Sequence, residues 1–344
     1  MIIQNELTRR RFLKSAALAS MSVGLLNPQT SLLANPFGWP AALGNGGQGK
    51  KVGIIGLDTS HAVAFTKTLN AENPEPRFKG YRVVAAYPQG SKDIVSATER
   101  VPGYIEQVKA LGVEIVDSIA SLLKKVDVIL LESNDGRVHL EQAVPVIQAG
   151  KTLFIDKPIA ASYNDAKKIF ELARQKGVPI FSSSSLRYME SIKQVQSGSV
   201  GAVLGADTYS PAHLESTHPD FYWYGIHGIE MLFAIMGTGC ESVMRLHTED
   251  TDVVVGYWAD GRLGTYRGTR SGKSDYGGIV FGEKGNTYLG KFDGYNPLLE
   301  QIINFFESGV APVSAEQTLE ICAFIEAADQ SKSNGGTLVK LNKN

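Results

Sequence analysis

The chain has 344 residues, a net charge of −1 and an apolar fraction of 43%, values typical of an ordinary soluble globular protein. No basic excess or mixing of aromatic with basic residues indicates a nucleic-acid partner, and two cysteines are too few for a disulfide framework. The length is generous for one hydrophobic core and comfortable for two domains. We predict that Cys240 and Cys322 are small buried thiols, with one disulfide between them as the alternative.

The N-terminus has the pattern of an export signal. Residues 8–14, TRRRFLK, match the twin-arginine pattern, and a weakly hydrophobic stretch follows at 16–26. That stretch is too short to cross a bilayer of about 30 Å as a helix. We predict a twin-arginine signal peptide over 1–34, a linker over 35–50, and a periplasmic or otherwise exported protein without a stable membrane span. A basic amphipathic helix is the alternative for the same residues.

Segment 51–61, KVGIIGLDTSH, predicts the first strand, tight turn and helix of a dinucleotide-binding fold. Its glycine fingerprint is only partly present. Gly56 fits the first position, but Asp58 stands where the second glycine is expected and His61 where the third is expected.

Strands and helices then alternate up to residue 181, as in a doubly wound parallel sheet. Apolar runs predict strands at 52–55, 81–87, 126–131, 152–155 and 179–181. Helical spacing predicts helices at 60–70, 104–111, 118–125, 139–149 and 164–176. We therefore predict an α/β Rossmann-type domain over 51–181.

The pattern changes after four serines at 182–185. Short strands are expected at 203–209, 242–248, 251–258, 261–268 and 277–282, and helices at 228–236, 297–308 and 316–332. The Asp260-Gly261 pair supplies the positive φ of a hairpin turn. We predict a second, α+β domain over 182–344 with a mostly antiparallel sheet.

Several motifs in order give the chain a resemblance to the glucose–fructose oxidoreductase / inositol dehydrogenase family (Gfo/Idh/MocA). The most specific is 139–160, HLEQAVPVIQAGKTLFIDKPIA, which is similar to the family's histidine-led helix, Gly-Lys turn, strand and Glu-Lys-Pro tripeptide. Other family-like segments are Arg187-Tyr188, 282–285 and 326–331. The resemblance covers nearly everything from 51 to 341. It implies a carbohydrate or polyol substrate, NADP or NAD as cofactor, and a homo-oligomer formed through the open face of the second sheet.

The replaced glycine decides how the implied cofactor is held. A carboxylate at Asp58 would cost roughly 3 kcal/mol for each phosphate charge at about 5 Å. Three solutions are open: Asp58 caps the helix through the N–H groups of Ser60 and His61, the pyrophosphate shifts to the hydroxyls of Thr59 and Ser60, or the site no longer holds a dinucleotide.

The second strand lacks the acidic residue that usually holds the adenosine ribose. Tyr87 is expected to stack on adenine, and Ser91 and Lys92 to meet a 2′-phosphate, which favours NADP; a solvated turn is the alternative. The complete set of expected cofactor contacts is Gly56, Asp58, Thr59, Ser60, Tyr87, Ser91, Lys92, Ser133, His139, Asp156 and Lys157.

The resemblance also implies the catalytic groups. Lys157 would lie between nicotinamide and substrate hydroxyl, His227 would accept the hydroxyl proton, and Glu230, on the same helix face, would orient the imidazole. An exposed lysine and a buried, satisfied histidine are the alternatives. The expected substrate contacts are Arg187, Tyr188, Tyr222, Trp223 and His227, with Trp223 replacing the aspartate usual in the family.

Metal-ligand residue types occur at His213, Glu215 and His218, but their spacing fits no zinc signature, and we predict no metal site.

We predict an NAD(P)-dependent oxidoreductase acting on a secondary hydroxyl of a carbohydrate or polyol, with tightly bound cofactor because free cofactor is scarce outside the cytoplasm. One alternative is an NAD-dependent glycosidase or lyase that works through transient oxidation of the sugar. Another is a non-catalytic sugar-binding protein on a degenerate dehydrogenase scaffold, which the residues Asp58, Tyr87 and Trp223 favour.

Overall fold

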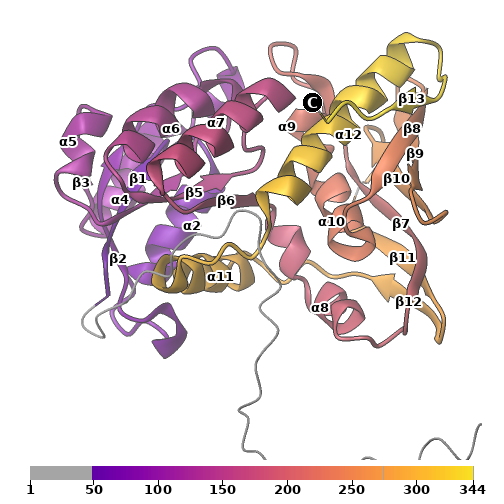
Figure 1. The fold of residues 1–344 in the computed structure, drawn as a ribbon. Helices are drawn as coiled ribbons and strands as arrows, with labels where there is room; N and C mark the ends of the chain where they lie inside the picture. Colours follow the sequence, from indigo (N-terminus) through magenta and orange to yellow (C-terminus); the bar gives the residue numbers. More distant parts are fainter. Residues whose placement is uncertain (1–48, 274, 344) are drawn as a thin grey trace, which may run out of the picture. The chain divides into compact units, whose positions relative to one another are not determined.

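The computed structural model describes residues 49–273 and 275–343, so the expected signal peptide and nearly all of the expected linker lie outside the described residues. Two sheets with their helices make up this part of the chain (Figure 1). None of its helices has the length and hydropathy that a membrane span requires.

The first sheet has six parallel strands in the order β3-β2-β1-β4-β5-β6 (Figure 1). They are β1 (Lys51–Ile55), β2 (Arg82–Tyr87), β3 (Glu114–Ile115), β4 (Val128–Leu131), β5 (Thr152–Asp156) and β6 (Ile180–Ser183). The order changes direction between β1 and β4, and sheets of this kind bind ligands beyond the carboxyl ends of the strands at that point. The Rossmann-type prediction is confirmed.

Helices cover both faces of this sheet. They are α2 (Ser60–Leu69), α3 (Val95–Thr98), α4 (Val101–Ala110), α5 (Ile119–Leu123), α6 (His139–Gln148) and α7 (Tyr163–Lys176), with 3-10 turns η1 (Pro76–Phe78), η2 (Gly136–Val138) and η3 (Ser185–Tyr188). The ends of α7 show how the sequence sets a boundary: the Ser162 hydroxyl accepts from the Asp165 N–H, and Gly177 ends the helix at a left-handed φ of 66°.

The second sheet has the order β12-β11-β7-β10-β9-β8-β13. Only its central pair, β7 with β10, is parallel among the described strands, so the mostly antiparallel prediction is confirmed. Its strands are β7 (Val203–Pro211), β8 (Cys240–His247), β9 (Thr251–Trp258), β10 (Leu263–Thr269), β11 (Gly277–Gly282), β12 (Gly285–Leu289) and β13 (Val339–Lys340). The accompanying helices are α8 (Glu190–Gln196), α9 (Asp220–Trp223), α10 (Ile226–Met236), α11 (Asn296–Ser308) and α12 (Ala315–Ser333). Cys240 and Cys322 are buried free thiols, as expected.

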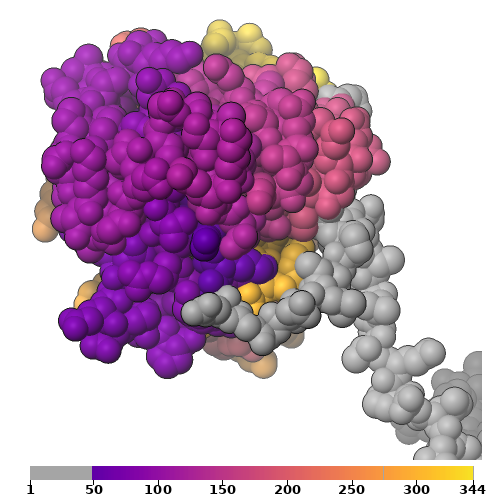
Figure 2. Space-filling view, turned by 90° about the vertical axis from the view of Figure 1, so that its left-hand side faces the viewer, coloured from indigo at the N-terminus to yellow at the C-terminus, as the bar shows by residue number. Residues whose placement is uncertain are grey.

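Helix α11 comes late in the sequence but completes the core of the first sheet. Its apolar face, including Leu299 and Phe305, packs with Phe154 of β5 and Phe181 of β6. The Lys50 ammonium donates to a carbonyl near the end of α11, and in Figure 2 the amber surface of α11 lies beside the indigo surface of the first described residues. The core under the first sheet therefore depends on residues more than a hundred positions further along the chain.

Candidate functional site

A cavity of about 240 Å³ lies where the first sheet changes direction. The first domain contributes Thr59, Ser60, His61, Ser96, Arg100, Asn134 and Lys157 to its wall. The rest of the chain contributes Ser185, Leu186, Trp223, Tyr224, His227, Tyr276, Phe292 and Tyr295. The start of α2, the turn after β5 and the start of α10 thus meet around one space. This brings the expected residues Thr59, Ser60, Lys157, Trp223 and His227 together.

Asp58 does not cap α2. Its carboxylate is buried and accepts hydrogen bonds from the Ser91 N–H at 2.8 Å and the Asn134 N–H at 2.9 Å. A Cβ at Gly90 would lie 2.2 Å from this carboxylate, so a glycine there makes room for it. The Thr59 hydroxyl caps the helix instead, accepting from the His61 N–H at 3.4 Å. The prediction that Asp58 caps α2 is therefore wrong, because its carboxylate accepts from the amides of the loops that follow β2 and β4.

Gly56 is needed for packing between loops. It has a φ of +87°, and a Cβ there would lie 2.5 Å from the backbone nitrogen of Ser133. Ser133 in turn donates its hydroxyl to Gln142 at 2.6 Å. These contacts hold the turn after β1 against the loop after β4, and they do not line the cavity.

The residues expected around adenosine are largely engaged with the protein itself. Ser91 uses its N–H on Asp58, and its hydroxyl donates to Asp135 at 3.3 Å. Tyr87 donates its hydroxyl to Gln89, while Lys92 is exposed with its ammonium 3.8 Å from Glu141. Both the N–H and the hydroxyl of Ser91 thus already donate to carboxylates of the protein, so neither is free to donate to a 2′-phosphate. The preference for NADP over NAD loses that support.

His139 supports the loops around the site. It is fully buried, with Nδ1 2.8 Å from the Pro158 carbonyl oxygen and Nε2 2.7 Å from the Ser133 carbonyl oxygen. The expected cofactor contact at His139 is thus a structural bridge between the loops that follow β4 and β5.

His227 lines the cavity, and its Nδ1 is 2.9 Å from the Ser184 hydroxyl. Burial, helped by the nearby charges of Lys157 and His61, lowers its pKa well below the ordinary value. The imidazole is therefore neutral near pH 7 and able to accept a proton.

Glu230 does not orient His227. Its carboxylate accepts from the Arg187 guanidinium at 2.9 Å, and the same nitrogen donates to the Glu230 carbonyl oxygen at 2.9 Å. Spacing correctly put His227 and Glu230 three residues apart on α10, but the buried Arg187 takes up the carboxylate. The predicted roles of Glu230 in catalysis and Arg187 in substrate binding are therefore wrong, and Ser184 is the residue that holds the imidazole.

Two further substrate candidates lie away from the cavity wall. Tyr222 is buried and donates its hydroxyl to the Cys322 carbonyl oxygen at 3.3 Å. Tyr188 does not line the cavity either, and burial raises its pKa to about 12. Sequence reasoning missed the cavity residues Tyr276 and Tyr295, which lie on irregular segments with no periodic pattern, and Arg100, which borders two short helices.

The metal-ligand types upstream of α10 do not converge. His213 is exposed and Glu215 is half-buried, whereas His218 is buried, with its Nε2 accepting from the Gly136 N–H at 3.3 Å. Burial lowers the pKa of His218 to about 4.

This histidine predicts a loss of stability in acid. The unfolded chain binds a proton at His218 near the ordinary pKa of 6.5, while the folded chain resists it down to about pH 4. The free energy of unfolding should therefore fall as the pH drops through this range, by about 3 kcal/mol for this residue. Urea unfolding of the wild type and His218→Gln at several pH values measures the effect. The variant should show a shallower pH dependence, and equal slopes would contradict this account.

Residues 50–184 match the GFO_IDH_MocA family, described as an oxidoreductase family with an NAD-binding Rossmann fold. The match covers the whole first sheet, so the first domain is similar to the NAD-binding Rossmann domains of that family. The "Uncharacterized oxidoreductase YhhX" of Escherichia coli (strain K12) is 26% identical over 113 residues, which cover 29% of this chain and 32% of that relative. The chain thus matches about a third of that relative's length.

Solved dehydrogenases share the whole two-sheet fold. A probable dehydrogenase from Thermotoga maritima has a TM-score of 0.67 at 22% identity, covering 85% of this chain and 98% of that one. Myo-inositol 2-dehydrogenase from Lactobacillus plantarum has a TM-score of 0.70 at 18% identity, covering 86% and 100%. A Lactobacillus casei scyllo-inositol dehydrogenase with bound NAD(H) and scyllo-inositol has a TM-score of 0.67 at 17% identity, covering 86% and 99%. At these identities the likeness shows the fold; with the family match it supports an NAD-dependent oxidoreductase.

Proposed function

We propose that this protein is an NAD(P)-dependent oxidoreductase that acts on a secondary hydroxyl of a polyol or carbohydrate, with a tightly bound cofactor. The observation that carries the proposal is the meeting of Lys157 and His227 on one cavity at the start of α2. Support for a polyol comes from the myo-inositol and scyllo-inositol dehydrogenases that share the fold.

The cavity suits the charged part of a dinucleotide. The first N–H groups of a helix attract phosphate, and Ser60 at the start of α2 lies on the cavity wall together with Arg100. Asp58 is held by the loops after β2 and β4, so the helix end is not capped by a carboxylate. When bound, the nicotinamide supplies the hydride acceptor, and NAD and NADP remain equal candidates.

The chain's own residues would handle the proton. Lys157 donates a hydrogen bond to the substrate oxygen and stabilises the charge that develops there. His227, with its ring held by Ser184, accepts the hydroxyl proton as the carbinol is oxidised. Trp223 offers a flat apolar surface to the ring of the substrate.

The test is whether the purified protein holds a cofactor. Denaturation followed by chromatography should release close to one nicotinamide dinucleotide per chain, and its mass identifies NAD or NADP. No release, together with no binding of added NAD or NADP, would refute the proposal. With cofactor present, oxidised sugar products support the oxidoreductase, whereas redox-neutral bond cleavage would support the glycosidase or lyase alternative.

We also propose export through the twin-arginine pathway, on the TRRRFLK segment, and a homo-oligomer formed through the second sheet. Exposed apolar side chains lie on its strands, at Leu204, Tyr209, Tyr257, Leu263 and Tyr288. Uncleaved protein found only in the cytoplasm would refute export, and a monomer in analytical ultracentrifugation would refute the oligomer.

A further inference from the structure

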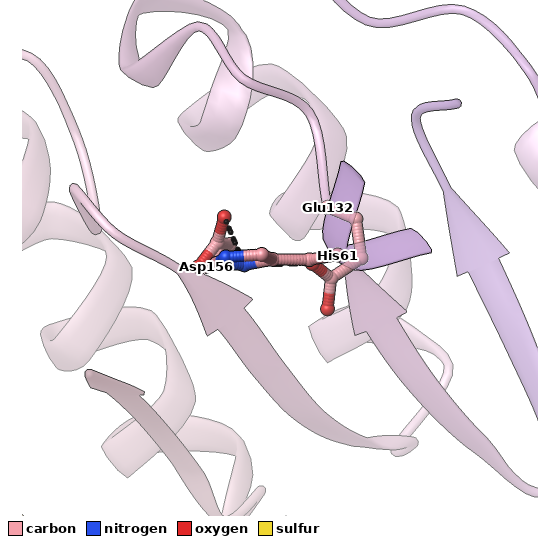
Figure 3. A group of neighbouring side chains, drawn as sticks. All are labelled: His61, Glu132 and Asp156. Atoms are coloured by element: carbon pink, nitrogen blue, oxygen red, sulfur yellow. Dashed lines mark ion pairs between the residues drawn. The ribbon is translucent and has the colours of Figure 1, made fainter. Parts of the chain in front are cut away.

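Three buried side chains converge beside the cavity, at the carboxyl edge of the first sheet. Figure 3 shows His61 from the first turn of α2 between Glu132, which follows β4, and Asp156, which ends β5. The His61 Nδ1 atom lies 3.1 Å from an Asp156 carboxylate oxygen and 3.9 Å from a Glu132 oxygen. One donor atom from each residue lies within 4.8 Å of the other two.

Five atoms of this cluster make no hydrogen bond of standard geometry among the described residues, although the His61 Nδ1 atom and one Asp156 oxygen form an ion pair at 3.1 Å. Both carboxylate oxygens of Glu132, both of Asp156 and the Nδ1 atom of His61 are buried and unsatisfied. Glu132 and Asp156 are completely shielded from solvent, and His61 is 5% exposed. A buried polar group without a partner is costly, and a buried charge more so, so the two carboxylates need a compensating charge beyond the one His61 contact.

Other buried acids of this chain have their partners within the protein. Asp58 accepts from two backbone N–H groups, Glu230 pairs with Arg187, and Asp252 pairs with Arg245 at 2.8 Å. The contrast shows that the fold ordinarily satisfies its buried carboxylates. Near the cluster, Lys157 supplies positive charge to both carboxylates, while Asp58 adds negative charge toward Glu132.

We propose that His61, Glu132 and Asp156 bind one divalent transition-metal cation, of the Mn²⁺, Fe²⁺ or Zn²⁺ class. One imidazole nitrogen with two carboxylates is a donor set that these ions accept, and the ion's two positive charges balance the two acids. Metal–ligand bonds of about 2.0–2.2 Å put neighbouring donors roughly 3–4 Å apart, in line with the distances observed here.

The site adjoins the cavity through His61 alone. His61 lines the cavity wall, and its ring contacts Tyr295 with centroids 4.4 Å apart. Three protein ligands leave at least one coordination position open for water or another oxygen ligand. The inference rests on the donor set alone, so it stands whether or not the proposed oxidoreductase function is correct.

A shared proton is the competing explanation, because one proton on the carboxylates with a charged imidazole would also neutralise the cluster. Wild-type protein without a polyhistidine tag should be stripped with EDTA and titrated with Zn²⁺ and with Mn²⁺ by calorimetry. We expect one equivalent of at least one ion to bind, and the melting temperature to rise by several degrees. A melting temperature indifferent to EDTA and to both ions would overturn the proposal.

Glu132→Gln separates the two explanations, because the amide keeps the shape and removes the charge. Metal binding predicts at least about 100-fold weaker affinity, since even groups that only support a metal ligand are worth about 10- to 100-fold. The shared-proton explanation predicts no metal response in the wild type and a variant at least as stable. If Glu132→Gln fails to fold, His61→Asn repeats the test. Glu141→Gln is the control, because it removes a carboxylate from the exposed surface of α6 and should leave metal binding unchanged. Equal binding by wild type and Glu132→Gln would show surface ions only and refute the site.

Discussion

Replacing Lys157 with alanine is expected to lower the single-turnover rate constant of hydride transfer by about 10²- to 10⁴-fold while the nicotinamide dinucleotide stays bound. The lysine side chain is 7% exposed and faces the cavity that His227 also lines. Its removal takes away the hydrogen bond to the substrate oxygen, whereas the helix end proposed for the phosphates is unchanged. Hydride transfer to the bound cofactor, followed at 340 nm with myo-inositol and scyllo-inositol as first substrates, measures the effect.

The pH profile gives this variant a second readout. The Lys157 charge helps to lower the pKa of His227, so its removal should raise that pKa and move the acid limb of kcat/KM to higher pH. Lys168→Ala is the matched control, because Lys168 is exposed on α7 and pairs with Asp165 at 2.9 Å. Unchanged turnover in Lys157→Ala would refute the catalytic assignment. Loss of the cofactor from this variant would instead show that Lys157 serves to bind the cofactor.

Replacing Glu230 with alanine is expected to reduce the free energy of unfolding by about 3–5 kcal/mol, because the buried Arg187 guanidinium loses its carboxylate partner and keeps only neutral acceptors, the Gln317 side chain and the residue 230 carbonyl. Arg187 is 6% exposed and donates to both the carboxylate and the carbonyl oxygen of Glu230 at 2.9 Å. Urea unfolding at pH 7 measures the loss.

The double variant Arg187→Met with Glu230→Leu provides the control. Removing both charges together should recover most of the stability, because apolar side chains of similar size tolerate this buried position better than one unpaired ion. A loss below about 1 kcal/mol for Glu230→Ala would mean that Arg187 finds other partners, and that the pair is not what holds the end of η3 to α10.

The local pattern of apolar and polar residues predicts the long strands and helices correctly. The expected strand at 251–258 coincides with β9, and the expected helix at 164–176 differs from α7 by one residue. The expectations missed β3, β13 and α3, because two to four residues are too few to display a period. The 12 residues from 285 to 296 hold β12 and the turn into α11, where hairpin pairing rather than sequence pattern decides the structure.

The sequence predicts which residues share a helix face better than it predicts which side chains bind one another. Helical spacing correctly put Glu230 near His227, but it carries no information on Arg187, which is 43 residues away and takes up the carboxylate. In the sequence, His61 stands in place of the third fingerprint glycine, and the local pattern does not indicate the partners of its side chain. Its neighbours Glu132 and Asp156 were within reach of sequence reasoning, because parallel strands end at one common edge and polar residues at those ends must lie close together.

Helix α11 has a consequence for the order in which the molecule can be made. Helices α2 and α4 contribute to the same core, but the part of the sheet around Phe154 and Phe181 lacks the cover of α11 until residues 296–308 have left the ribosome. We therefore expect co-translational folding of the N-terminal half to stay incomplete until then, with apolar surface around these aromatic residues exposed on the nascent chain. A fragment that stops at residue 184 should aggregate for the same reason, which makes this nucleotide-binding half a poor module for transplantation into other proteins.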